Sequence, residues 1–229
     1  MYIRCKVKPN HKSTGFPPNS MADKQKEARM PTTKQTATGT VYQFKITLKD
    51  SKPPVWRRIQ VTNNITLSRF SATLLTVMGW NGGHLHELRI GDKDYGMPDE
   101  EFDDSKSIID EKTVRLRDLS ESALKRFIFV YDFGDGWEHE IELEKVLEPE
   151  YKVNYPVCLD GARTCPPDDC GGTGGYEDFL EAIRDSKHPE HESMLEWIGG
   201  KFDPEEFNVK CINRALKRVH EAEALFKDF

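Results

Sequence analysis

The chain has 229 residues, of which 37% are hydrophobic and 31% charged, and its formal net charge is −6 at pH 7. This length allows one large domain or two small ones around a buried core. Residues 1–39 hold eight Lys or Arg against two acidic residues, so their net charge of +6 leaves −12 on residues 40–229. The net negative charge of residues 40–229 repels the phosphate backbone of a nucleic acid. The sequence therefore disfavours a nucleic-acid partner for this part of the chain.

The chain has an odd number of cysteines, namely Cys5, Cys158, Cys165, Cys170 and Cys211. Its N-terminal residues include no apolar segment of the kind that a signal peptide has. This pattern argues against the disulfide framework of a secreted protein. No run of residues approaches the roughly 18 apolar residues that a membrane-spanning helix needs. We therefore expect a cytoplasmic protein without membrane contact, in which clustered cysteines are thiols or metal ligands.

The N-terminal segment is unlike the rest of the chain. Residues 8–39 are rich in Pro, Lys, Ser and Thr and show no apolar period. Such a composition cannot bury enough apolar surface to fold. We expect a disordered basic tail at 1–39 and a single domain at 40–229. Met21 and Met30 both lie in the tail and would allow a later translation start.

The domain is predicted to begin with a hairpin and a helix. Apolar and polar residues alternate over 41–48, and a second strand over 55–61 follows a run of turn residues. Thr66 predicts the N-cap of a helix that runs to Met78 and ends at a glycine. Beyond the helix, the pattern predicts a strand over 84–90, an acidic loop over 91–112 and a short strand over 114–116.

The best-defined element is a second hairpin, with strands over 127–132 and 137–147 around Gly134-Asp135-Gly136. A loop of two or four residues pairs Asp132 with Trp137. Strand side chains alternate between faces, so this register predicts one shared core face for Ile128, Val130, Asp132, Trp137, His139, Ile141 and Leu143. Trp137 should then be buried, and Asp132 should accept backbone N–H groups or orient His139. Asp135, at the tip, should be more exposed.

The end of the chain is predicted to be helical. A loop over 154–175, rich in Pro, Gly and Cys, precedes a helix through 176–183 and a second one that starts at Pro189. Asp203-Pro204 predicts the start of a last helix, which should bury Phe207, Cys211, Ile212, Ala215, Val219 and Phe226. Strands come first and helices last. This order indicates an α+β fold, a mostly antiparallel sheet with helices packed on one side.

Four motifs occur in a characteristic order along the domain. They are Pro53-Pro54-Val55-Trp56-Arg57-Arg58, Gly79-Trp80 with His84-Leu85-His86, Asp132-Phe133-Gly134-Asp135-Gly136-Trp137-Glu138-His139, and Cys165-Pro166-Pro167-Asp168-Asp169-Cys170-Gly171-Gly172. Together they resemble the plasmid pRiA4b ORF-3-like family, from about Thr40 to about Leu216. The resemblance implies an α+β domain in a prokaryotic cytosol and, for some members, an association with plasmids or insertion elements. It implies no agreed activity, so no catalytic residue is carried over.

A metal site is the first candidate. Cys158, Cys165 and Cys170 could ligate zinc, although they lack the paired spacing of structural zinc sites. His84 and His86, two apart on a predicted strand, point the same way and could chelate an ion. The alternative, which we favour, is a rigid loop whose prolines fix the backbone and whose turn is capped by Asp168 and Asp169.

Catalytic chemistry is the second candidate. Asp132 and Asp135 with His139 could supply a general acid or base, but aspartates beside glycine turns more often hold the turn through backbone hydrogen bonds. Cys165 or Cys170 with a histidine could form a reactive pair. No local signature of a cysteine enzyme surrounds either residue.

A binding module is the third candidate and the one we favour. The hairpin turn, the Cys-Pro-Pro loop and the His84–His86 segment could converge on a surface that includes Trp80, Trp137 and Tyr176. Aromatic side chains with a few polar groups suit a cleft for a peptide or a small ligand. We therefore expect an accessory protein that binds another protein or a small molecule. The alternative is a zinc-binding protein or an enzyme that uses an Asp/His/Cys site at the same place.

Overall fold

The computed structural model describes residues 39–98 and 108–225. The predicted tail before Gly39, part of the predicted acidic loop and Phe226 lie outside the described residues, as does the Val219 side chain. In the part of the chain that is described, no helix has both the length and the apolar character needed to cross a bilayer.

The centre of the fold is a sheet of eight strands in the order β5-β4-β3-β6-β7-β1-β2-β8. Neighbouring strands are antiparallel except β4 and β5, which are parallel. The strands are β1 (Val41–Leu48), β2 (Trp56–Thr62), β3 (His86–Ile90), β4 (Lys93–Gly96), β5 (Ile109–Asp110), β6 (Arg126–Tyr131), β7 (Trp137–Leu147) and β8 (Val157–Ala162).

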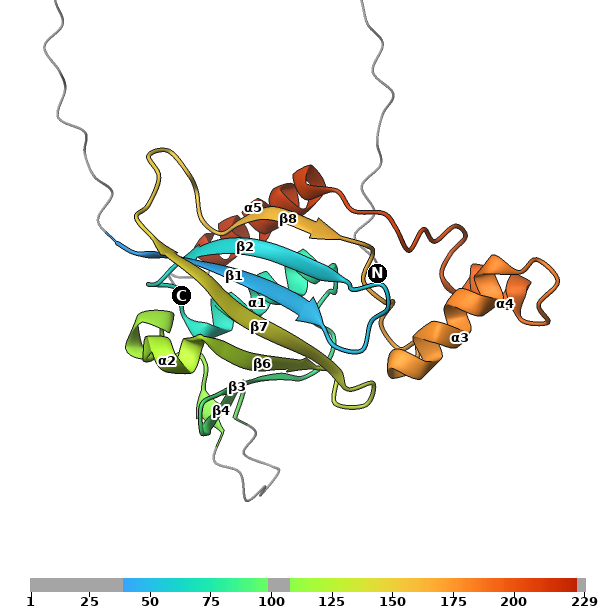
Figure 1. The fold of residues 1–229 in the computed structure, drawn as a ribbon, viewed down its shortest axis with the longest axis horizontal. Coiled ribbons are helices and arrows are strands. Elements are labelled where there is room, and N and C mark those ends of the chain that lie inside the picture. The colour runs from blue at the N-terminus through green and yellow to red at the C-terminus, as the bar shows by residue number, and fades with distance from the viewer. Residues whose placement is uncertain (1–38, 99–107, 226–229) are drawn as a thin grey trace, which may run out of the picture.

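The helices are α1 (Leu67–Met78), α2 (Glu121–Leu124), α3 (Gly172–Arg184), α4 (His191–Trp197) and α5 (Val209–Leu225), with a 3-10 turn at Leu116–Asp118. Helices α1 and α5 lie on one face of the sheet, and α3 and α4 lie beyond its end (Figure 1). This arrangement confirms the predicted α+β fold with helices packed on one side.

The core forms between α1 and the covered face of the sheet. Phe70 of α1 packs against Phe44 and Phe127, with ring centroids 5.3 Å and 6.2 Å away. The helix begins as predicted, because the Thr66 hydroxyl accepts the N–H of Arg69 and caps the first turn. It ends at Gly79, whose φ of 109° favours glycine.

Several short elements were not predicted. Strands β4 and β5 lie in the predicted acidic loop, and β8 lies in the predicted loop over 154–175. Each has two to six residues and lies at or near a sheet edge, where polar residues are tolerated and alternation is too short to detect. The predicted strand over 114–116 is instead a single bridge from Arg115 to Thr66, followed by the 3-10 turn.

The predicted start of the last helix at Asp203 is wrong. The Asp203 carboxylate accepts the N–H of Glu205 and closes a local turn. The helix begins instead after Asn208, whose side-chain oxygen accepts the N–H groups of Lys210 and Cys211, each at 3.1 Å. A capping side chain competed with the proline signal and determined the boundary.

The predicted register of the second hairpin is also wrong, by one residue. Trp137 pairs with Tyr131 rather than Asp132, and His139 pairs with Phe129 rather than Val130. The loop therefore spans 132–136, an odd number of residues, in which Asp132 and Gly136 both have positive φ. A one-residue shift moves a strand's partners to the other face. Trp137, His139 and Ile141 consequently share the core face with Tyr131, Phe129 and Phe127.

Candidate functional site

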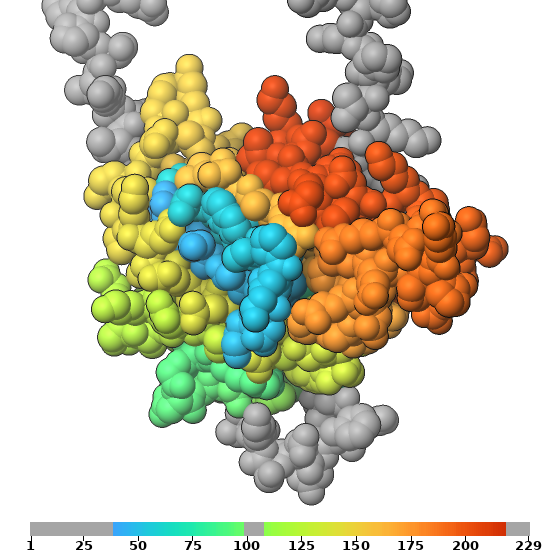
Figure 2. Space-filling view, turned by 45° about the vertical axis from the view of Figure 1, so that its right-hand side comes forward, coloured from blue at the N-terminus to red at the C-terminus, as the bar shows by residue number. Residues whose placement is uncertain are grey.

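Three segments from distant parts of the sequence meet at one end of the sheet. They are the residues before β3, the turn over 132–136 between β6 and β7, and the loop over 165–172 before α3. The backbone N–H of Asp132 donates to the carbonyl of Leu85 at 2.9 Å, and the N–H of Gly171 donates to the Asp135 carboxylate at 3.2 Å. Figure 2 shows the β6–β7 turn beside the beginning of α3.

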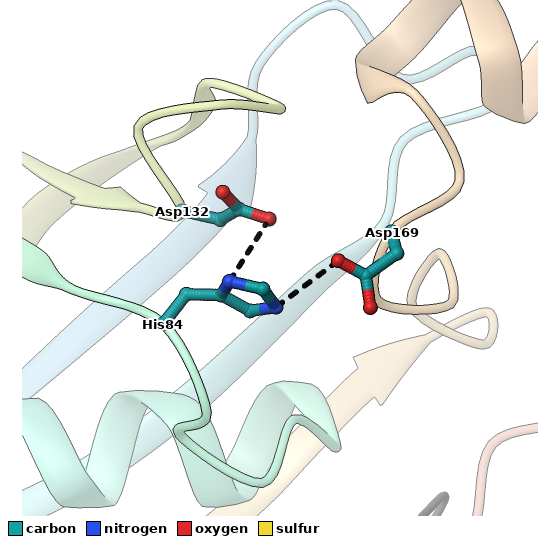
Figure 3. Close-up of side chains that lie close together, drawn as sticks. All are labelled: His84, Asp132 and Asp169. Carbon is teal, nitrogen blue, oxygen red and sulfur yellow. Dashed lines mark ion pairs between the residues drawn. The ribbon is translucent and has the colours of Figure 1, made fainter.

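His84 lies at the point where the three segments meet (Figure 3). Its Nδ1 is 3.7 Å from Oδ2 of Asp132, and its Nε2 is 3.3 Å from Oδ1 of Asp169. The Asp132 side chain is 10% exposed, that of His84 33% and that of Asp169 71%. The group thus extends from the interior to the surface. Among the described residues, it is the sole group of three or more His, Cys, Asp or Glu whose ligand atoms lie within 4.8 Å of one another.

The turn fixes Asp132 in place. Its Oδ1 accepts the N–H of Gly134 at 3.0 Å and that of Asp135 at 3.4 Å, as expected for an aspartate that holds a turn. Its φ of 56° is left-handed, a region that Asp tolerates better than most residues. This conformation lets Oδ2 point away from the turn and toward His84 (Figure 3).

The loop over 165–172 is held against the sheet by aromatic side chains. Trp80 donates from its indole nitrogen to the carbonyl of Pro166 at 3.0 Å, and its ring lies 4.9 Å from that of Tyr131. Tyr131 in turn donates its hydroxyl to Asp168 at 3.2 Å. Burial raises the pKa of Tyr131 well above its ordinary value and also raises the pKa of Asp168. Asp168 therefore has a positioning contact, while Asp169 stays exposed.

His86 does not join His84. Its Nε2 is 3.2 Å from both carboxylate oxygens of Glu111, which also accepts a hydrogen bond from Ser71 at 2.8 Å. The predicted chelation by two histidines on one strand is therefore not formed, because His84 precedes β3 and turns to a different partner. Glu111 was missed by the sequence analysis, since it is one of many acids in the predicted loop.

Trp137, His139 and Tyr176 are buried below the site rather than exposed in it. His139 is fully buried and its Nδ1 pairs with the carbonyl of Phe129, so Asp132 does not orient it. Burial lowers the pKa of His139 to about 4, and the ring is neutral. Within the described residues, no hydrogen-bond partner reaches Trp137 Nε1, His139 Nε2 or the Tyr176 hydroxyl. These side chains pack the core, as expected for Trp137, and offer no surface for a ligand.

The three candidate cysteine ligands do not lie together in one group. Cys158 and Cys165 are buried, Cys170 is half-buried, and none is in a disulfide. The described residues contain no group in which the three sulfurs lie within 4.8 Å of one another. Burial raises the pKa of Cys158 to about 11 and that of Cys170 to about 12. A neutral thiol in apolar surroundings is a poor nucleophile, so a reactive cysteine gains no support here.

A separate cavity of about 460 Å³ lies between the end of α1 and α5 and is lined in part by Val77, Phe207 and Ile212. It does not include His84, Asp132 or Asp169. Arg57 at its floor is buried and donates to four backbone carbonyls, including those of Val77 and Ala162. This guanidinium is structural, and the cavity is apart from the cluster of polar side chains.

Comparison with known proteins gives consistent results. Residues 40–211 match the family described as plasmid pRiA4b ORF-3-like protein. The chain is 39% identical over 179 residues to the uncharacterized protein y4hQ of Sinorhizobium fredii, a match that covers 77% of this chain and 91% of the relative. It also resembles the crystal structure of MM3350, a protein of unknown function from Methanosarcina mazei. That match has a TM-score of 0.69 and 35% identity, and covers 76% of this chain and 98% of the other.

Proposed function

The chain belongs to the plasmid pRiA4b ORF-3-like family, whose name assigns no reaction. From the geometry of the site, we propose that the protein is a binding module for a positively charged ligand. The ligand binds where His84, Asp132 and Asp169 meet. The observation that carries this proposal is the position of one imidazole between two carboxylates from two different loops.

The charge of the site supports a cationic ligand. Four aspartates lie on the two loops: Asp132, Asp135, Asp168 and Asp169. Within residues 39–98 and 108–225, no Lys or Arg forms an ion pair with any of them, and His84 is the single basic side chain that pairs with two. Grouped carboxylates without counter-charges create a negative potential that attracts a cation.

The rim of the site supports a binding role as well. Leu85 and Phe133, next in sequence to His84 and Asp132, are 56% and 52% exposed. Large apolar side chains beside a polar cluster are typical of surfaces that contact a ligand or a partner. An organic cation would therefore find both charge and apolar contact here.

The hydrogen bonds favour a binding module over an enzyme. A general base must reach its substrate. His139 has no exposed surface, and Oδ1 of Asp132 is engaged by backbone N–H groups. The residues that stay accessible, His84 and Asp169, are suited to hold a ligand.

The test is a set of thermal-shift and calorimetric titrations of the full chain with three cationic probes: zinc ion, spermidine and a Lys/Arg-rich peptide. We expect at least one probe to bind, and the double variant Asp132→Asn/Asp169→Asn to weaken its binding by about tenfold or more. Asp178→Asn, on an exposed part of α3, removes the same charge elsewhere and should bind like the wild type. If no probe binds, or the double variant binds all three normally, the proposal is wrong.

A further inference from the structure

We propose that His84, Asp132 and Asp169 bind a divalent transition-metal ion, with one imidazole nitrogen and two carboxylate oxygens as ligands. This inference rests on the proposed function and specifies its ligand. It uses different residues from the cysteine site that the sequence suggested.

The distances between the side chains support shared coordination. The 3.7 Å from His84 Nδ1 to Asp132 Oδ2 is longer than a hydrogen bond, and the 3.3 Å from Nε2 to Asp169 Oδ1 is at its outer limit. Ligands that bind one ion at about 2.1 Å each lie roughly 3–4 Å apart. These two distances involve different ring nitrogens, but one ligand atom from each side chain lies within 4.8 Å of the other two. Modest side-chain rotations therefore bring one imidazole nitrogen and two carboxylate oxygens around a common ion.

The orientation of the Asp132 carboxylate is the second, independent observation. Asp132 is 7% exposed, and within the described part of the chain no donor makes a hydrogen bond to its Oδ2. Oδ2 is aimed at His84 instead, and a cation bound between Asp132 and Asp169 supplies a positive charge to both carboxylates.

The donor set defines the class of ion. Carboxylates alone suit Mg²⁺ and Ca²⁺, whereas an imidazole favours zinc, cobalt and similar transition metals. Three protein ligands leave at least one coordination position open. Because the Asp169 side chain is 71% exposed, this position faces solvent, and the ion can exchange and contact a further ligand. The ion would also join the β6–β7 turn to the loop before α3.

The experiment is a titration of the full chain, first stripped with EDTA, with Co²⁺ followed by its visible absorption, and with Zn²⁺ as competitor. We expect one ion per chain, competition by Zn²⁺ and a higher thermal midpoint in the presence of metal. His84→Ala and Asp169→Asn should each weaken Co²⁺ binding by about tenfold or more. Both residues are accessible, so these variants should fold, which circular dichroism in EDTA verifies. Asp178→Asn should bind like the wild type.

Three outcomes would overturn the inference. One is no stoichiometric binding of either metal. Another is binding that His84→Ala and Asp169→Asn leave unchanged. The third is an intense thiolate-to-cobalt absorption that disappears in Cys165→Ser/Cys170→Ser, which would locate the ion at sulfur.

A further variant separates this inference from the proposed function. Leu85→Ser/Phe133→Ser should leave Co²⁺ binding unchanged but weaken the binding of an organic cation. If spermidine or the basic peptide binds through Asp132 and Asp169 while neither metal does, the metal inference fails and the proposed function stands. If no cation binds, both fail.

Discussion

At the scale of single residues, Trp137 anchors the strand that carries the site. Its ring lies 5.9 Å from that of Trp80, and the residue is 2% exposed. Trp137→Ala removes a large buried ring and should lower the free energy of unfolding by about 3–5 kcal/mol. Chemical denaturation measures this change. Trp197→Ala, at a residue that is 48% exposed, is the matched control and should cost much less. Equal losses in the two variants would contradict the assigned packing.

Asp132 has two oxygens with two different tasks, which substitutions can separate. Asp132→Ala leaves the N–H of Gly134 without its acceptor and should cost about 1–3 kcal/mol of stability. Asp132→Asn keeps the Oδ1 acceptor and should cost less, yet it removes the charge that faces His84. We therefore expect the Asn variant to unfold nearly like the wild type in urea and still to lose cation binding. If Asp132→Asn lost both its stability in urea and its cation binding, the two carboxylate oxygens would not have separate tasks.

His139 should make stability depend on pH. Burial first, and the nearby Arg57 charge in addition, lower its pKa from 6.5 to about 4 in the folded protein. The unfolded chain then binds a proton at a pH where the folded chain does not. This contribution to stability is complete above about pH 6.5 and is lost as the pH falls toward 4. The loss is about 3 kcal/mol by linkage.

Urea denaturation between pH 7 and pH 4 measures this effect. His139→Met, which cannot titrate, should flatten the dependence by about that amount, and His188→Met should not. An unchanged slope in His139→Met would show that another group is responsible.

At the scale of elements, the exposed edge of the sheet at β8 is closed by a side chain of α5. Asn213 accepts the N–H of Cys158 at 2.7 Å and donates to its carbonyl at 2.8 Å. These two bonds replace those of a neighbouring strand and protect the edge from pairing with another chain.

Asn213→Ala leaves both backbone groups of Cys158 unpaired and should destabilise the protein by about 1–3 kcal/mol. It should also increase self-association, which light scattering of the folded protein detects. Arg214→Ala, at the exposed neighbouring position, should do neither. A normal Asn213→Ala protein would mean that α5 packing alone protects the edge.

The longer elements could be predicted because they repeat a pattern. Strands β1 and β7 alternate over several residues, and α1 has both its cap and its terminal glycine. The short strands β4, β5 and β8 could not be predicted, because they show no alternating pattern in the sequence. They form only by hydrogen bonding to neighbouring strands of the sheet. The hairpin register failed for a related reason. The left-handed conformation of Asp132 adds a residue to the loop, and aspartate signals this conformation only weakly.

The same difference between sequence pattern and tertiary contact decides how much of the site could be predicted. The sequence predicted that the turn, the loop and the His84 segment converge, and the structure brings them together. It did not predict that His84 pairs with Asp132 and Asp169, since that depends on positive φ values at both aspartates. Trp137 and His139 lie on the core face, as the alternation of β7 predicts, and the shifted register changes only their partners on β6. Tyr176, on α3, is buried as well, so none of the three belongs to the exposed surface that the sequence suggested.

At the scale of the whole molecule, α1 and α5 cover one face of the sheet and leave the other face to charged side chains (Figure 1). On that open face, the ion pair Arg126–Glu140 joins the neighbouring strands β6 and β7, and Arg58–Glu144 joins β2 to β7 across β1. These carboxylates have basic partners, whereas among the described residues His84 is the single basic side chain that pairs with the aspartates at the end of the sheet. The unbalanced negative charge is therefore concentrated where the three loops meet, and the proposed function uses that location.

The most direct test of this account is a crystal structure of the full chain in the presence of Zn²⁺, with anomalous data collected on both sides of the zinc edge. We predict one strong anomalous peak at about 2.1 Å from a His84 ring nitrogen and from carboxylate oxygens of Asp132 and Asp169. The peak should disappear in crystals of Asp132→Asn/Asp169→Asn. An empty cluster beside a zinc ion bound at the cysteines, or no bound zinc at all, would contradict the claim that this cluster binds a metal ion.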